Sequence, residues 1–160
     1  MNNVYLGKFV GTHGLKGELK LISDFDKKDR VFIKDFPLVI DNNLYYIESA
    51  RPHKNYELIL LKDYNDINEV EQFINKNVYI RYDDLKLSDD EYLLSELLNA
   101  KVIDNLKKEL GRVTEIVKGV NNNFVKVNNK FLIPLIDIYI DKYNKKEKIL
   151  YTKNAYLLNI

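Results

Sequence analysis

The chain contains no cysteine and no tryptophan, and it has only one methionine, three prolines and six glycines. The lack of cysteine excludes disulfides, thiolate metal sites and cysteine nucleophiles. No apolar run approaches the roughly 18 residues that a membrane-spanning helix needs. The first residues lack the basic and apolar regions of a signal peptide. These absences indicate a cytoplasmic protein with no membrane association.

A strong charge of either sign is also lacking, since 25 basic residues against 24 acidic ones give a net charge of +1. A bulk electrostatic attraction to nucleic acid is therefore not indicated, and any such contact must come from local patches or be shared with a protein partner. A hydrophobic fraction of 46% is normal for a folded globular protein. The 160 residues suit one ordinary domain or two small ones.

Glycine is concentrated in one segment, because four of the six lie in residues 7–17, GKFVGTHGLKG. Glycine is used where the backbone needs a positive φ or where something approaches it closely, so this segment is a tight turn or a contact loop. A nucleotide-binding loop has Ser or Thr after its Gly-Lys, whereas Phe9 stands here. A turn of this kind can still present backbone amides and Lys16 to an anionic surface such as RNA. A purely structural turn stays the alternative.

Most of the first half of the chain predicts short strands. Asp41-Asn42-Asn43 separates two of them with residues that tolerate left-handed backbone. One helix is predicted to begin at Asp66, because Glu69 follows three residues later and apolar residues then repeat at helical spacing. The predicted strands are residues 4–10, 18–22, 38–40, 44–50, 57–62 and 77–82.

The second half begins after a polar, acidic segment at residues 83–91, which predicts a linker. Apolar residues resume at 92–98, and the short runs that follow predict a small antiparallel barrel. Pro134 is expected at a strand end because it cannot donate to a ladder. Residues 141–146 read as a turn, and residues 154–160 as a short helix or a partner contact. The apolar runs are 100–103, 110–117, 124–127, 131–136 and 148–152.

The sequence offers no catalytic or metal-binding set. His13 and His53 are the only histidines, and neither has a partner at ligand spacing, so a metal site is not predicted. Ser23 with His13 makes a poor nucleophilic set, because residues around Ser23 lack the strained turn that such a serine needs. Tyr92 and Leu93, which follow the acidic segment, either pack in a core or anchor a protein partner.

The order of these features resembles the RimM family of bacterial ribosome maturation factors over essentially the whole chain. Residues 7–18 are similar to the opening signature of that family almost residue for residue, and residues 68–71 are similar to its helix start. Leu93 departs from the family pattern, which usually has a second aromatic residue there, and Asn99 stands where glycine is common. Similar short motifs of the family's C-terminal PRC-barrel domain fall at residues 92–102, 110–113 and 132–134.

The resemblance implies a mainly β protein with two small β-barrels joined by a short linker. The N-terminal barrel with one helix would cover residues 1–83, the linker residues 84–90, and the PRC-barrel residues 91–160. The implied function is that of a non-enzymatic, monomeric ribosome assembly factor that promotes 16S rRNA processing without cofactor or metal. Its implied partners are the maturing small ribosomal subunit, ribosomal RNA of the head, and small-subunit ribosomal protein number nineteen.

Two contact sites are predicted on this basis. Docking on the ribosomal protein is expected of Tyr92 and Leu93. Two alternatives stay open: an enzyme whose glycine-rich loop holds a phosphorylated small molecule, and a PRC-barrel adaptor for another partner. The loop expected to contact RNA of the immature particle comprises Gly11, Thr12, His13, Gly14, Leu15, Lys16 and Gly17.

Overall fold

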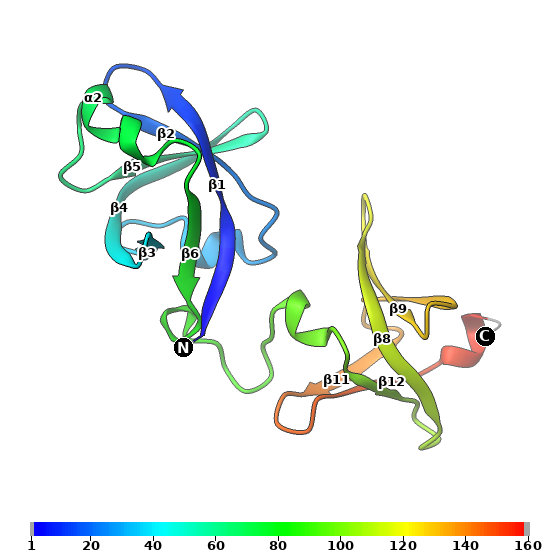
Figure 1. The fold of residues 1–160 in the computed structure, drawn as a ribbon. Coiled ribbons are helices and arrows are strands. Elements are labelled where there is room, and N and C mark those ends of the chain that lie inside the picture. The colour runs from blue at the N-terminus through cyan, green and yellow to red at the C-terminus, as the bar shows by residue number, and fades with distance from the viewer. Residues whose placement is uncertain (1, 159–160) are drawn as a thin grey trace. The chain divides into compact units, whose positions relative to one another are not determined.

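β-Strands build both parts of the chain, which divides into the units Met1–Lys86 and Leu87–Ile160 (Figure 1). The computed structural model describes residues 2–158. The prediction of a mainly β fold is confirmed. The domain boundaries expected at residues 83 and 91 stay predictions.

Six strands of the first unit close into a barrel in the order β1-β2-β5-β4-β3-β6. Full closure leaves no strand edge unpaired, which protects a small sheet from pairing with other chains. The unit also contains the helices α1 (Lys28–Val31) and α2 (Ile67–Val70) and the 3-10 turns η1 (Glu71–Phe73) and η2 (Tyr82–Leu85). The strands are β1 (Asn3–His13), β2 (Glu18–Ile22), β3 (Pro37–Ile40), β4 (Asn43–His53), β5 (Tyr56–Leu61) and β6 (Asn77–Arg81).

Two register shifts bend β1 so that it pairs with both of its neighbours. One lies between Tyr5 and Gly7 in the pairing with β6, and the other between Phe9 and Gly11 in the pairing with β2. Such bulges increase local bend and twist, which barrel closure needs. A Cβ at Gly7 would overlap the carbonyl oxygen of Ile22 on the adjacent strand. Part of the concentrated glycine therefore serves the closure of the barrel.

The predicted helix is present but shorter than its apolar pattern suggests. It begins after Asp66, whose carboxylate accepts a hydrogen bond from the N–H of Asn68 at 2.8 Å. After four residues it continues only as η1. Val70 and Phe73 are buried, as the helical spacing predicts.

The second unit is a six-stranded sheet in the order β10-β9-β8-β7-β12-β11. Its 3-10 turns are η3 (Leu94–Leu97) and η4 (Ala155–Leu158). Residues 159–160, at the end of the predicted C-terminal contact segment, lie outside the described residues. The strands are β7 (Lys101–Ile103), β8 (Glu109–Lys118), β9 (Asn123–Val127), β10 (Phe131–Pro134), β11 (Ile140–Asn144) and β12 (Ile149–Thr152). The buried core consists of Leu97, Ala100, Val102, Val113, Val125, Val127, Ile133, Tyr143 and Leu150.

Two features of this unit differ from the sequence-based expectation. β12 pairs with β7 in parallel, not antiparallel, and the long chain segment between them supplies the crossover that a parallel pair requires. The expected turn at 141–146 is largely strand, because β11 covers Ile140–Asn144. β11 lies at an edge of the sheet, where polar residues are normal. Pro134 ends β10, as predicted.

Candidate functional site

The predicted contact loop covers the end of β1 and the turn into β2. Residues 11–13 belong to β1, and residues 14–17 form a four-residue turn. Leu15 is 84% exposed, and Lys16 is exposed as well, whereas Gly17 is buried. The side chains of Leu15 and Lys16 are therefore the accessible part of the turn.

The start of α2 holds this turn in place. The carbonyl oxygen of Leu15 accepts a hydrogen bond from the N–H of Ile67 at 3.2 Å. Gly17 has a φ of +87°, and a Cβ there would lie 3.0 Å from the carbonyl oxygen of Asp66. Both the backbone conformation and the close approach favour glycine. Because the backbone is fixed on both sides of Lys16, its charge extends from a defined position.

The pairing of β2 with β5 brings the β4–β5 hairpin next to the same turn. The ring of His13, the last residue of β1, packs on the ring of His53, the last residue of β4, with 4.8 Å between centroids and 52° between planes. Glu18 accepts two hydrogen bonds from the Arg51 guanidinium, at 3.1 Å from Nε and 3.0 Å from Nη2. The histidine pair and this bidentate ion pair connect the two hairpins.

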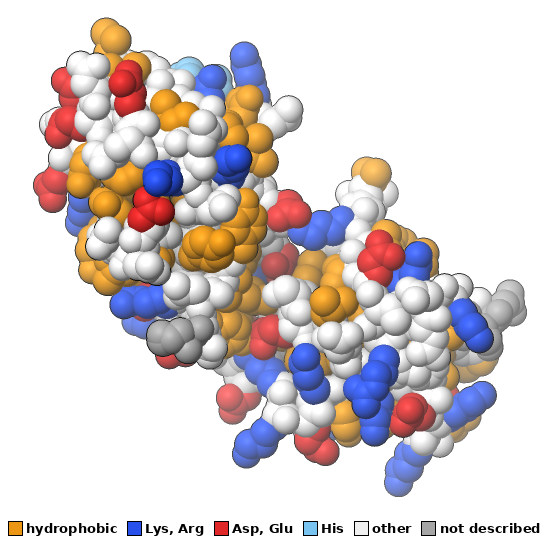
Figure 2. Space-filling model, in the orientation of Figure 1, with side chains coloured by type: hydrophobic (Ala, Val, Ile, Leu, Met, Phe, Trp, Pro, Cys, Tyr) orange, Lys and Arg blue, Asp and Glu red, His pale blue; other side chains and the backbone are white. Residues whose placement is uncertain are grey.

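Positively charged groups lie near the histidine pair, and Figure 2 shows blue Lys or Arg side chains beside the pale-blue histidine surface at the rim of the view. Burial, followed by neighbouring cations, holds the pKa of His53 below its usual value. The nearby acid is Glu18, whose pKa is lowered, first by its hydrogen bond to Arg51. The surface is thus locally cationic in a chain of nearly neutral overall charge. The cations that lower the pKa of His53 are His13, Lys54, Arg51 and Lys20.

The arrangement suits anion binding better than acid–base catalysis. Histidine rings with centroids 4.8 Å apart leave no room for a phosphate group between them, so they cannot act as acid and base on its two sides. No three His, Cys, Asp or Glu side chains within residues 2–158 come together to hold a metal ion. What the two hairpins offer is a set of N–H donors and positive charges on one surface.

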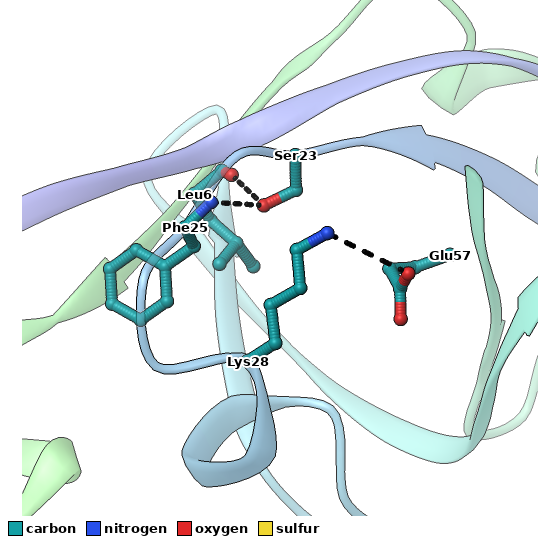
Figure 3. A network of polar contacts seen from close by, with 5 residues as sticks. All are labelled: Leu6, Ser23, Phe25, Lys28 and Glu57. Atoms are coloured by element: carbon teal, nitrogen blue, oxygen red, sulfur yellow. Dashed lines mark hydrogen bonds and ion pairs between the residues drawn. The ribbon is translucent and has the colours of Figure 1, made fainter. Parts of the chain in front are cut away.

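Ser23, considered above as a nucleophile, has a structural role. Its hydroxyl donates a hydrogen bond to the carbonyl oxygen of Leu6 at 2.6 Å and accepts one from the N–H of Phe25 at 3.2 Å (Figure 3). Nearby, Lys28 and Glu57 form an ion pair at 3.9 Å (Figure 3). These contacts fix the chain between β2 and α1.

The second predicted site lies at the start of the second unit. Tyr92 is partly buried, and its ring packs edge-to-face on Tyr143 with 5.2 Å between centroids. Burial, followed by the charge of Asp137, raises the pKa of Tyr92. Leu93 is only 1% exposed, and its N–H donates a hydrogen bond to the Glu96 carboxylate at 2.7 Å. The side-chain surface that this pair offers a partner therefore belongs to Tyr92, and the docking role of the pair stays a prediction.

Sequence reasoning did not connect residues 51–54 with the glycine-rich loop. Arg51, His53 and Lys54 cluster where a hairpin end was to be expected, and this basic cluster was the available signal. Their proximity to His13 depends on the long-range pairing of β2 with β5, which local patterns do not encode. The structure brings the two histidines together across 40 positions of sequence.

The first unit matches a family model, that of the RimM N-terminal domain, over residues 4–85. Two relatives, each called ribosome maturation factor RimM, are similar along most of their length. The one from Natranaerobius thermophilus is 34% identical and aligns with 92% of this chain and 89% of its own. The one from Oceanobacillus iheyensis is 35% identical over 91% and 90%. The first unit is thus a barrel of the RimM N-terminal type. The chain belongs to the RimM family, and the resemblance predicted from its sequence is confirmed.

Among solved structures, a RimM 16S ribosomal RNA processing protein from Pseudomonas aeruginosa aligns with a TM-score of 0.48 at 20% identity. The alignment covers 95% of this chain and 97% of that one. No helix within residues 2–158 is long and apolar enough to cross a bilayer.

Proposed function

We propose that this chain is a non-enzymatic ribosome assembly factor that binds the maturing small ribosomal subunit and promotes processing and folding of 16S rRNA. The proposal is supported by relatives more than 30% identical that are called ribosome maturation factors. The observation that carries it is the β1–β2 turn, whose backbone is fixed by α2 and whose Lys16 is exposed. In this proposal the protein acts in the cytoplasm as a monomer, without metal or cofactor.

The RNA contact is assigned to residues 11–17 and to ribosomal RNA of the subunit head. Phosphate groups dominate the affinity of proteins for RNA, and a few well-placed cations suffice when a protein contact supplies the rest. A Cβ at Gly14 would meet nothing within 4 Å, so the turn has open space on its outer side. A phosphate can approach the backbone there while Lys16 supplies the charge.

The protein contact is assigned to Tyr92 and Leu93, with small-subunit ribosomal protein number nineteen as the partner. Tyrosine is a frequent anchor of protein interfaces, and Tyr92 keeps part of its ring accessible. Asp137 lies close enough to raise the pKa of Tyr92, and residues 89–91 add three acidic side chains just before it. Proteins that bind rRNA are typically basic, so the charge around Tyr92 favours such a partner.

Co-sedimentation with immature small subunits tests both contacts. Lys16→Ala is expected to weaken binding and to lower the slope of log affinity against log salt by about one, because one phosphate contact is lost. Tyr92→Ala is expected to weaken binding by about tenfold or more, since a partly buried aromatic anchor is removed. The matched controls are Lys34→Ala on the first unit and Tyr156→Ala, a tyrosine that is 73% exposed, on the second. If both variants are folded and bind as tightly as the controls, the assignment of these two contacts is wrong.

A thermal-shift panel of nucleotides and sugar phosphates tests the enzyme alternative. A ligand that binds the native state raises its apparent stability, so an enzyme that holds phosphorylated molecules would melt at a higher temperature with one of them. We expect no shift at millimolar ligand. A clear rise that Lys16→Ala abolishes would support the enzyme in place of the assembly factor.

A further inference from the structure

The β4–β5 hairpin presents basic groups that lie outside the contact loop described above. We propose that the ends of the β1–β2 and β4–β5 hairpins form one binding surface for RNA phosphate groups, to which Lys20, His53 and Lys54 contribute. This inference rests on the proposed function, because it takes the RNA to be that of the maturing small subunit. It adds a second hairpin to the assigned RNA contact.

The geometry places these groups on one surface. His53 packs on His13, which belongs to the contact loop itself, with 4.8 Å between ring centroids. Lys54 is exposed at the tip of the β4–β5 hairpin, next to His53. The Nζ of Lys20 lies 5.3 Å from the centroid of the Tyr56 ring, on the neighbouring strands β2 and β5. The surface therefore joins His13 of the contact loop to the β4–β5 hairpin.

The charges on this surface are not balanced from within. Glu18 is the acid that responds to both histidines, and both of its carboxylate oxygens are occupied by Arg51. Among the described residues, neither Lys20 nor Lys54 forms an ion pair with an acid. Two lysines beside the histidine pair thus remain to be neutralised by a ligand. Phosphate groups of an RNA backbone supply negative charge at several adjacent positions, as this spread of cations requires.

The histidine pair gives the contact a diagnostic property. The groups that face His53 are His13 from β1, Lys20 and Glu18 from β2, and Arg51 and Lys54 from its own hairpin. Burial, followed by the neighbouring positive charges, lowers the pKa of His53 in the free protein. A phosphate at this surface would offset the positive charge and raise that pKa again, so the complex holds more protons than the free protein. Affinity therefore rises as pH falls toward the free-state pKa.

Filter binding with protein-free 16S rRNA and co-sedimentation with immature small subunits test the inference together. The variants are His53→Gln, Lys54→Ala and the double change, and Lys34→Ala is the control for loss of one surface charge on the same unit. Thermal melting confirms that each variant is folded. We expect the double variant to bind both probes about tenfold more weakly, with a salt slope lower by about one. Wild-type affinity is expected to increase from pH 8 to pH 6, and His53→Gln to flatten that increase.

Each other outcome overturns the inference in a recognisable way. If the double variant binds as tightly as Lys34→Ala, the β4–β5 hairpin does not take part, while the proposed function stands. If the variants lose binding to particles but the wild type ignores protein-free rRNA, the surface meets a protein and the assignment to RNA phosphate is wrong. If the wild type binds neither probe, the proposed function fails together with the inference.

Discussion

Leu15 in the β1–β2 turn and Leu93 at the start of the second unit both belong to segments predicted to contact a partner, yet their environments are opposite. Leu15 is 84% exposed, while Leu93 is 1% exposed. The turn is a place where the backbone is fixed by Ile67 and Gly17 and the side chains point outward. At the start of the second unit, the Glu96 carboxylate fixes the backbone of Leu93, and the side chain of Leu93 is buried.

The difference shows which sequence signals report on surfaces. Gly14 and Gly17 indicate a turn with positive φ angles. In this backbone conformation the side chain of Leu15 stays in solvent. An apolar residue after a polar segment carries no such constraint, so burial, which is worth about 2 kcal/mol for a leucine, is its default outcome. A leucine suggests a contact surface only where the backbone prevents it from reaching a core.

The same substitution at the two leucines gives the largest expected contrast. Leu93→Ala should lower the free energy of unfolding by about 3 kcal/mol, because it removes buried apolar atoms and leaves a cavity. Leu15→Ala should change it by less than about 0.5 kcal/mol, as exposed substitutions usually do. Denaturant titration of both variants measures the difference. Equal effects would mean that the contrast in burial has no energetic consequence.

Much of the fold could be predicted from local patterns, and the parts that could not are explained by long-range pairing. Residues 18–22 alternate as strand β2 does, and the left-handed turn at Asp41 and Asn42 follows from its residue types. β11 was missed because its residues are mostly polar, and only its position at the sheet edge makes that acceptable. The parallel pairing of β7 with β12 joins segments too distant for any local signal.

The candidate site follows the same rule. The exposed turn with Lys16 could be predicted, because glycine content and spacing are local properties of the sequence. The histidine pair could not, because the approach of His13 and His53 depends on the long-range pairing of β2 with β5. The burial of Leu93 could not be decided either, since an apolar residue after a linker fits both a core and an interface.

Two glycines of the β1–β2 turn allow the role of its backbone to be tested. Gly14 and Gly17 both have positive φ, at +74° and +87°, but only a Cβ at Gly17 would approach other atoms, the carbonyl of Asp66 among them. Gly17→Ala should therefore cost about 2 to 3 kcal/mol, from backbone strain and crowding together. Gly14→Ala should cost about 1 kcal/mol from strain alone. Thermal unfolding of both variants under one buffer condition separates the two contributions. A Gly14→Ala effect as large as that of Gly17→Ala would contradict the anchoring of the turn on α2.

A smaller effect on stability is expected from removal of the Tyr143 hydroxyl group in the second unit. The Tyr143 hydroxyl donates a hydrogen bond to the carbonyl oxygen of Glu96 at 2.9 Å, and this links the core of the second unit to η3. Tyr143→Phe should lower the free energy of unfolding by about 1 kcal/mol, the usual value for one partly buried hydrogen bond. Tyr156→Phe, at a side chain that is 73% exposed, is the control and should have almost no effect. If the two variants have the same free energy of unfolding, the hydrogen bond between Tyr143 and η3 does not stabilise the second unit.

The smallest expected effect on stability comes from the Glu18–Arg51 ion pair, and it depends on pH. The Arg51 guanidinium holds the pKa of Glu18 below its ordinary value of 4.5. A carboxylate with a lowered folded-state pKa stabilises the native state above its unfolded-state pKa, and it loses that contribution as pH falls through the folded-state pKa. Glu18→Gln should therefore be slightly less stable than the wild type at pH 7, and the difference should shrink below about pH 4.5. Unfolding midpoints at pH 7, 5 and 3.5 measure this, with Glu71→Gln at an exposed position as the control. Because the side chains of Glu18 and Arg51 are partly in solvent, this difference in stability at pH 7 should be the smallest of the four predicted effects. If Glu18→Gln and the wild type differed by the same amount at all three pH values, the Glu18–Arg51 ion pair would be excluded as the source of the difference.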